Sequence, residues 1–197
     1  MRSIYKIVVC SLLTLSITSC EKDLLEKEQY QKEIYLIGAY NRVWTTEVSY
    51  SNEEVKTYFT VSSSGTLALD RDVNVKMKIN EELVDIYNKK YWTVLNEDKY
   101  YKSLDTDLYS IPSLENTVIK HAEGISAEVP VLIKTASLKI DQSYVIPVEI
   151  ESTTGYPISE SGYKMLILLK LKNDYSGSYQ MSGQFHAGFE SFHIIVV

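Results

Sequence analysis

Alternation of apolar and polar residues is the dominant pattern of this chain between residues 33 and 172. The clearest case is 73–79, where four apolar residues alternate with three polar ones: Val73, Val75, Met77 and Ile79 against Asn74, Lys76 and Lys78. A period of two places successive side chains on opposite faces of a strand. This segment is therefore predicted to be a strand with one buried face and one wet face.

Similar patterns predict seven further strands, at 34–37, 43–50, 55–62, 117–121, 125–133, 144–150 and 164–171. The last of these is apolar almost throughout, which predicts burial on both faces. Gly124 lies in the turn between 117–121 and 125–133, which predicts a hairpin. Pro147 cannot donate a hydrogen bond to a neighbouring strand, so an edge position or a bulge is favoured for its strand.

One segment carries helix signals instead. Asn80 offers an N-cap, acidic residues follow in the first turn, and Lys89 and Lys90 close the last turn, so the charges suit the helix dipole. We predict one short helix over about residues 81–90. The following segment, 91–113, is aromatic and acidic without a sustained period, which predicts a long aromatic loop of the kind that often carries a binding site.

Many short strands, frequent turns and a single helix favour an all-β fold, an antiparallel β-sandwich over residues 33–172.

Tyrosine is unusually frequent, with 16 tyrosines against 4 phenylalanines. Tyrosine suits half-exposed strand faces, and its ring can also stack on the apolar face of a sugar. The strand explanation is favoured over the sugar-binding one.

The N-terminus has the pattern of a bacterial lipoprotein signal. Arg2 and Lys6 accompany an 11-residue apolar run, Ile7 to Ile17, and Thr18-Ser19 precedes Cys20. The run is shorter than the roughly 20 residues that span a bilayer. We expect cleavage after residue 19 and acylation of Cys20, which would hold the protein on a membrane.

The alternative is an ordinary secretory peptide with an incidental cysteine. Residues 20–32 are charged and polar and are predicted to be a tether between the anchor and the domain.

Net charge excludes one class of partner. Without residues 1–19 the chain has 18 Lys and Arg against 26 Asp and Glu, a net charge of 18 − 26 = −8. This argues against nucleic acid and anionic lipid headgroups, which are bound through concentrated positive charge.

Cys10 leaves with the signal and Cys20 is acylated, so neither a disulfide nor a thiolate metal site is expected.

No catalytic motif is present in the sequence. The three histidines are scattered without HExxH spacing, no serine lies in a GxSxG turn, and no glycine-rich phosphate loop exists. Asp70 with Asp72, and Asp105 with Asp107, are close carboxylate pairs that are better explained as solvated turn acids than as contacts to a cation or sugar. We predict no enzyme activity, no metal site and no cofactor.

Two functions remain. The first is glycan binding by exposed aromatic rings, for which the candidates are Trp44, Tyr91, Trp92, Tyr100 and Tyr101. The second is a structural spacer or a protein–protein interaction module without a ligand of its own. Burial of Trp92 and Tyr101 against the sandwich would favour the spacer.

Residues 73–150 resemble the bacterial lipoprotein domain called domain of unknown function 1735, found in glycan-utilisation loci of Bacteroidetes. The resemblance rests on the order of an alternating strand, a helix and several short motifs: Tyr87-Asn88, Leu95 with Tyr100-Tyr101, Glu123-Gly124, Ser126-Ala127 and the segment YVIPVEI at 144–150. The sequence departs from the usual family pattern at Asn96 and at His121-Ala122, where the family favours proline.

The resemblance implies an immunoglobulin-like β-sandwich on a lipid-anchored outer-membrane protein. That protein is expected to face the cell surface, with the periplasm as the alternative. It also implies a role in glycan binding or presentation, with an outer-membrane transporter or other surface lipoproteins as further partners. In relatives a second module follows, in some a family 18 glycosidase. Residues 173–179 resemble the start of a β-rich second module, and the apolar end 194–197 predicts that this module is truncated.

Overall fold

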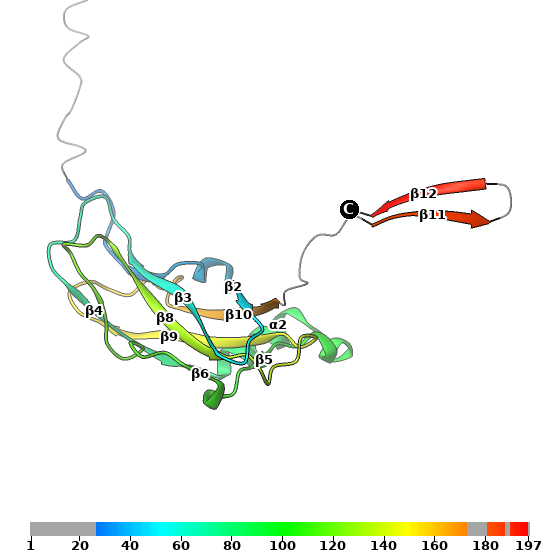
Figure 1. The fold of residues 1–197 in the computed structure, drawn as a ribbon. Helices are drawn as coiled ribbons and strands as arrows, with labels where there is room; N and C mark the ends of the chain where they lie inside the picture. The colour runs from blue at the N-terminus through cyan, green and yellow to red at the C-terminus, as the bar shows by residue number, and fades with distance from the viewer. Residues whose placement is uncertain (1–26, 173–180, 188–189, 197) are drawn as a thin grey trace, which may run out of the picture.

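The computed structural model describes residues 27–172, 181–187 and 190–196. The predicted signal peptide and Cys20 lie outside these residues. Strands of the region 34–172 form two sheets that pack face to face around one hydrophobic core, so the predicted β-sandwich is confirmed (Figure 1).

The first sheet has four strands in the order β1-β3-β8-β6, and all its pairings are antiparallel. Its strands are β1 (Ile34–Leu36), β3 (Glu54–Ser63), β6 (Tyr109–Ser110) and β8 (Ser126–Lys134). The short strand β1 also bonds to the loop before β10, through Ile34 N to Pro157 O at 2.8 Å and Leu36 N to Gly162 O at 2.9 Å. β1 therefore connects the two layers.

The second sheet has six strands, in the order β2-β10-β9-β4-β7 with β5 beside β9. They are β2 (Val43–Ser49), β4 (Val73–Ile79), β5 (Lys102–Ser103), β7 (Thr117–Ile119), β9 (Tyr144–Thr153) and β10 (Lys164–Lys172). The pairs β2–β10 and β5–β9 are parallel, so this sheet is mixed rather than purely antiparallel. Alternation within a strand does not specify the direction of its neighbour.

The core lies between the sheets and is built from the inward positions of every long strand. Its main members are Phe59 and Val61 of β3, Val73, Val75 and Met77 of β4, Val129, Val131 and Ile133 of β8, Ile146, Val148 and Ile150 of β9, and Met165, Ile167 and Leu169 of β10. Each such side chain contributes roughly 1.5–3 kcal/mol when fully buried. The period-two pattern thus predicted the core face correctly.

The predicted hairpin between β7 and β8 is wrong. β7 pairs with β4 and β8 pairs with β3, so the two strands lie in different sheets. Gly124 has φ 133° in the turn between them. A glycine of this kind permits a tight change of direction, but the sequence does not state whether the next strand returns to the same sheet or crosses to the other.

Of the two alternatives for the Pro147 strand, the edge position is wrong, because β9 lies in the middle of its sheet between β10 and β4. Its ladder with β4 does contain a register shift, between Lys76 and Met77. Along one side of β9 the neighbour changes at this point. Leu104 N donates to Val145 O at 2.9 Å, and Asn80 N donates to Pro147 O at 3.1 Å. The proline therefore sits at the junction of two partner segments, where a missing donor is tolerated.

The predicted helix is present as α2 (Glu82–Tyr91), shifted by one residue, and Asn80 Oδ1 accepts a hydrogen bond from Glu82 N at 3.2 Å. Leu83 and Val84 pack on Val145 and Leu166, on the outer face of β9 and β10. The region predicted as a loop contains the 3₁₀ helices η4 (Val94–Lys99) and η5 (Thr106–Leu108) as well as β5 and β6.

Two strands lie in the C-terminal region: β11 (Met181–Ala187) and β12 (Glu190–Val196) pair with each other as an antiparallel hairpin. The other residues of the expected second module lie outside the described part of the chain. Among the described residues, no helix has the length and apolar character needed to cross a membrane.

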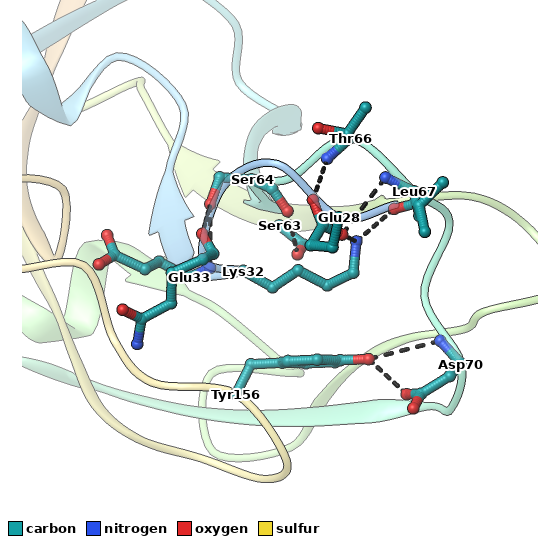
Figure 2. A network of polar contacts seen from close by, with 10 residues as sticks. Glu28, Lys32, Glu33, Ser63, Ser64, Thr66, Leu67, Asp70 and Tyr156 are labelled. Atoms are coloured by element: carbon teal, nitrogen blue, oxygen red, sulfur yellow. Dashed lines mark hydrogen bonds and ion pairs between the residues drawn. The ribbon is translucent and has the colours of Figure 1, made fainter. Parts of the chain in front are cut away.

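The last residues of the predicted tether contact the loop between β3 and β4 (Figure 2). Glu28 accepts hydrogen bonds from the Thr66 amide at 2.5 Å and the Leu67 amide at 3.3 Å, and it forms an ion pair with Lys32. Lys32 also donates to Leu67 O. Residues 28–32 are thereby attached to the sandwich immediately before β1.

This attachment is predicted to depend on pH. The Lys32 ammonium and the Thr66 amide lower the pKa of Glu28 from 4.5 to about 2. A pKa lowered by folding means that the ionised carboxylate is the form that the fold binds. The contribution is therefore complete above about pH 4.5 and is lost as the pH falls towards 2.

We expect amide protection of Thr66 and Leu67, corrected for intrinsic exchange, to fall over that range in hydrogen-exchange NMR. Glu28→Gln should cause the same loss at pH 7. Glu33→Gln should not, because the Glu33 side chain makes no ion pair or hydrogen bond within residues 27–172. Unchanged protection in Glu28→Gln would contradict the assignment.

Candidate functional site

A tight loop between β1 and β2 displays one tyrosine almost completely. The 3₁₀ helix η3 (Ala39–Asn41) is flanked by two left-handed residues, Gly38 with φ 89° and Arg42 with φ 63°. Tyr40, in the middle of η3, is 86% exposed. Ala39 beside it is buried in the core, so the loop is attached to the domain at the residue next to the exposed ring.

Packing fixes the shape of this loop. A Cβ on Gly38 would lie 2.5 Å from Trp44 Cε3, so only glycine fits where the indole ring approaches the backbone. On the other side of η3, Arg42 O accepts a hydrogen bond from Leu166 N of β10 at 2.8 Å. The Trp44 ring therefore packs against the start of the loop at Gly38, and a hydrogen bond from β10 fixes the end of the loop at Arg42.

A cleft of about 290 Å³ opens beside Tyr40. It is bounded by the η3 loop, helix α2 and the start of β10 with the residues that precede it. Its lining consists of Ala39, Tyr40, Arg42, Leu83, Ile86, Tyr87, Glu160, Ser161, Lys164, Met165 and Leu166. Apolar and aromatic walls with a few charged groups at the rim are typical of small-molecule sites.

A second hollow of about 210 Å³ adjoins the first. Tyr40 and Ser161 line both hollows, and the remaining walls of the second come from β1, Gly38 and the loop before β10. Gly162 lets these two segments approach, because a Cβ there would lie 2.7 Å from Tyr35 Cβ. Tyr40 thus stands between two contiguous hollows.

Tyr87, in the wall formed by α2, belongs to a cluster of three tyrosines. Its ring stacks on Tyr101 with centroids 5.2 Å apart and an interplanar angle of 10°, and it lies 4.5 Å from the Tyr91 ring. Two hydrogen bonds of 2.9 Å join the side chain of Asn88 to the backbone of Tyr101: Asn88 Nδ2 donates to Tyr101 O, and Asn88 Oδ1 accepts from Tyr101 N. Burial raises the pKa of Tyr87 to about 12, and the neighbouring Tyr101 is the second cause of this rise. The phenol of Tyr87 therefore stays protonated near neutral pH.

The five predicted stacking residues do not line either hollow. Trp44 packs against Gly38 at the start of the η3 loop, while Tyr91 and Tyr101 contact the ring of Tyr87. Trp92 is half-buried with Lys99 Nζ 5.7 Å from its ring, and Tyr100 is half-buried. Three of the five, Trp44, Tyr91 and Tyr101, therefore contact residues of the lining without being part of it.

Sequence reasoning missed Tyr40, Tyr87, Arg42, Glu160 and Lys164. Only Tyr40 had a local signal, because it stands between Gly38 and Asn41, two residue types that favour turns. The other four come together from three separate segments, which no local pattern reports.

The first of the two carboxylate pairs considered in the sequence analysis, Asp70 and Asp72, has partners within the protein. Asp70 pairs with Arg71 at 2.9 Å and accepts a hydrogen bond from the Tyr156 hydroxyl, and Asp72 lies 2.6 Å from His121 Nδ1. Within the described residues, no group of three or more His, Cys, Asp or Glu side chains is arranged to hold a metal ion.

Fold and site together define a β-sandwich with a surface cleft beside an exposed tyrosine. A family model described as an N-terminal domain matches residues 30–157, more than half of the chain. The chain belongs to this family, the DUF1735-like N-terminal domains. No curated protein matches the sequence.

Solved structures from Bacteroides share the fold. A multidomain protein including DUF1735 from Bacteroides ovatus is 18% identical, with a TM-score of 0.56 over 79% of this chain and 51% of that one. A putative carbohydrate binding protein from B. ovatus is 18% identical, with a TM-score of 0.54 over 70% of this chain and 36% of its own.

An auxiliary nutrient binding protein from Bacteroides thetaiotaomicron is 15% identical, with a TM-score of 0.57 over 80% of this chain and 56% of its own. The chain thus spans between about a third and somewhat over half of the length of these proteins. At these identities the similarity establishes the fold.

Arg42 provides a stability test of the site. A left-handed backbone is unfavourable for a residue with a Cβ and ordinary for glycine. We expect Arg42→Gly to raise the free energy of unfolding by about 0.5–1 kcal/mol in urea denaturation. Arg42→Ala removes the same guanidinium but keeps the Cβ, so it should give no such gain. Equal stability of the two variants would contradict strain at this position.

Proposed function

We propose that this chain is a non-catalytic glycan-binding domain of a bacterial glycan-utilisation system and that it binds an oligosaccharide across Tyr40. The observation that carries the proposal is the placement of Tyr40, 86% exposed between two contiguous hollows. An exposed aromatic ring that lies between two hollows can stack on a ligand seated in either of them.

Sugar chemistry fits this arrangement. A pyranose ring has an apolar face of C–H groups that stacks on a flat aromatic ring, while its hydroxyls require hydrogen-bonding partners. Arg42, Glu160 and Ser161 supply such partners at the rim. The larger hollow, at about 290 Å³, lies at the lower end of the roughly 300–1,000 Å³ of small-molecule sites. We expect one sugar unit in each hollow.

Similar proteins support the proposal. Two of the structures with this fold are described as a putative carbohydrate binding protein and an auxiliary nutrient binding protein. The site itself argues against hydrolysis, because glycosidases use two carboxyl groups on either side of the bond. Glu160 is the one carboxylate that lines the hollows of the described region.

The alternative, a structural spacer or interaction module, has one observation in its favour. Trp92 and Tyr101, whose burial would indicate a spacer, are both half-buried and packed against other parts of the chain. Their rings therefore contribute to packing within the domain. Tyr40 differs from them because it is 86% exposed and stacks on no other ring of the described residues. The glycan proposal depends on this difference.

Tyr40→Ala tests the glycan proposal directly. The full chain is screened on an array of host and plant glycans, and each hit is titrated by calorimetry. We expect Tyr40→Ala to weaken binding about tenfold or more, because loss of one stacked ring costs on the order of 1.4 kcal/mol. Tyr58→Ala is the matched control, since Tyr58 is also exposed but lies on β3 of the other sheet.

A folded protein that binds no glycan on the array would favour the spacer. Equal losses in the two variants would also contradict binding across Tyr40.

We further propose that Cys20 is acylated and anchors the protein in the outer membrane, where its domain faces the cell surface. The basis is the sequence around Cys20. In bacterial cells, wild-type protein should partition into the membrane fraction and Cys20→Ala should not. Protease added to intact cells should degrade a surface-facing domain. Membrane association that survives Cys20→Ala would exclude the lipid anchor.

A further inference from the structure

We infer that the cleft binds an acidic saccharide, a sugar unit that carries a carboxylate or sulfate group. This inference rests on the proposed function and goes beyond it, because stacking on Tyr40 alone would not distinguish acidic from neutral sugars. The anion is assigned to Arg42 and Lys164, two cations in the wall of the larger hollow.

The backbone conformation of Arg42 is unusual for a residue with a side chain. Among the described residues it is the one non-glycine residue with positive φ, at 63°. Glycine, asparagine or aspartate would fit this conformation better. An arginine kept in an unfavourable conformation at the rim of a cleft indicates that its side chain has a use there.

The guanidinium of Arg42 also lacks a partner within the fold. The described region has two arginines, and Arg71 forms two hydrogen bonds of 2.9 Å to the carboxylate of Asp70. For Arg42, no side-chain hydrogen bond or ion pair occurs within residues 27–172. Its five donors are therefore available, and their planar fork matches a carboxylate or sulfate group.

Lys164 adds a second positive charge on the same side. It lies two residues before Leu166 on β10, so both side chains point to the outer face of the sheet, where Leu166 packs against α2. Leu166 N is also the donor that holds Arg42 O. Lys164 forms no ion pair within residues 27–172, and its ammonium lies 4.8 Å from the Tyr163 ring.

The charge of the cleft is opposite to that of the protein. The whole chain has a net charge of −6, while the wall of the larger hollow contains two cations and one carboxylate, Glu160. A neutral sugar would need no such reversal, and a cationic ligand would be repelled. With the anion on Arg42, Glu160 is left to accept hydrogen bonds from sugar hydroxyls.

The test compares matched pairs of sugars on the full chain by calorimetry: lactose against 3′-sialyllactose, and maltotriose against trigalacturonic acid. A sulfated lactose separates sulfate from carboxylate recognition. We expect at least one acidic probe to bind about tenfold or more tightly than its neutral counterpart, the effect of one charge-assisted pair. The preference should shrink as salt is raised from about 50 to 500 mM.

Variants assign the preference to residues. Arg42→Gln and Lys164→Gln should each reduce it, and Arg42→Glu should abolish it. Lys170→Gln is the control, because Lys170 lies on the same face of β10, six positions along, outside the cleft lining. Tyr40→Ala should weaken acidic and neutral probes alike.

The outcomes separate this inference from the proposed function. Equal, Tyr40-dependent binding of acidic and neutral sugars would overturn the acidic specificity and leave glycan binding intact. An acidic preference that Lys170→Gln removes as effectively as Arg42→Gln would also overturn it, as an effect of overall charge. Absence of Tyr40-dependent binding to any sugar, from a folded sample, would overturn both.

Discussion

Burial of strand β10 on both faces is the constraint on which the rest of the structure depends. Met165, Ile167 and Leu169 point into the core between the sheets, and Leu166 points outward into a second cluster beneath α2. A strand with one wet face would leave the helix nothing to pack on. Because β10 needs cover on its outer side, α2 is held there, and the start of β10 becomes one wall of the cleft.

Beside the cleft, the fold imposes a backbone conformation that the local sequence does not favour at every position. Gly38 and Arg42 both take left-handed conformations, and the Trp44 ring occupies the space of a missing side chain at Gly38. Other local signals agree with the fold: Asn80 Oδ1 accepts a hydrogen bond from the amide of Glu82 at the start of α2, and the inward positions of the alternating strands form the core. A local conflict of this kind at a surface site is a common property of functional regions in proteins.

The tyrosines illustrate how one residue type serves two purposes. Tyr87 and Tyr101 stack on each other, and Asn88 bonds the backbone of Tyr101, so these rings stabilise the wall of the cleft. Tyr40 makes no comparable ring contact in the described region and is displayed by its loop. An acidic protein that presents Arg42 and Lys164 beside such a ring combines stacking with charge, two interactions that together select one class of ligand.

The sequence alone determined the eight strands with a period-two or apolar pattern, the helix and the core face, because these follow from residue periodicity and helix-end signals over short distances. It did not indicate the two-residue strands β5 and β6. It did not determine which strands pair, as β7 and Pro147 show, because pairing depends on contacts between distant segments. The five aromatic residues chosen from the sequence proved to lie outside the cleft lining. Only the tertiary structure brought Tyr40, Tyr87 and Lys164 together, since each comes from a different segment and their proximity exists only after the sheets and the helix have packed.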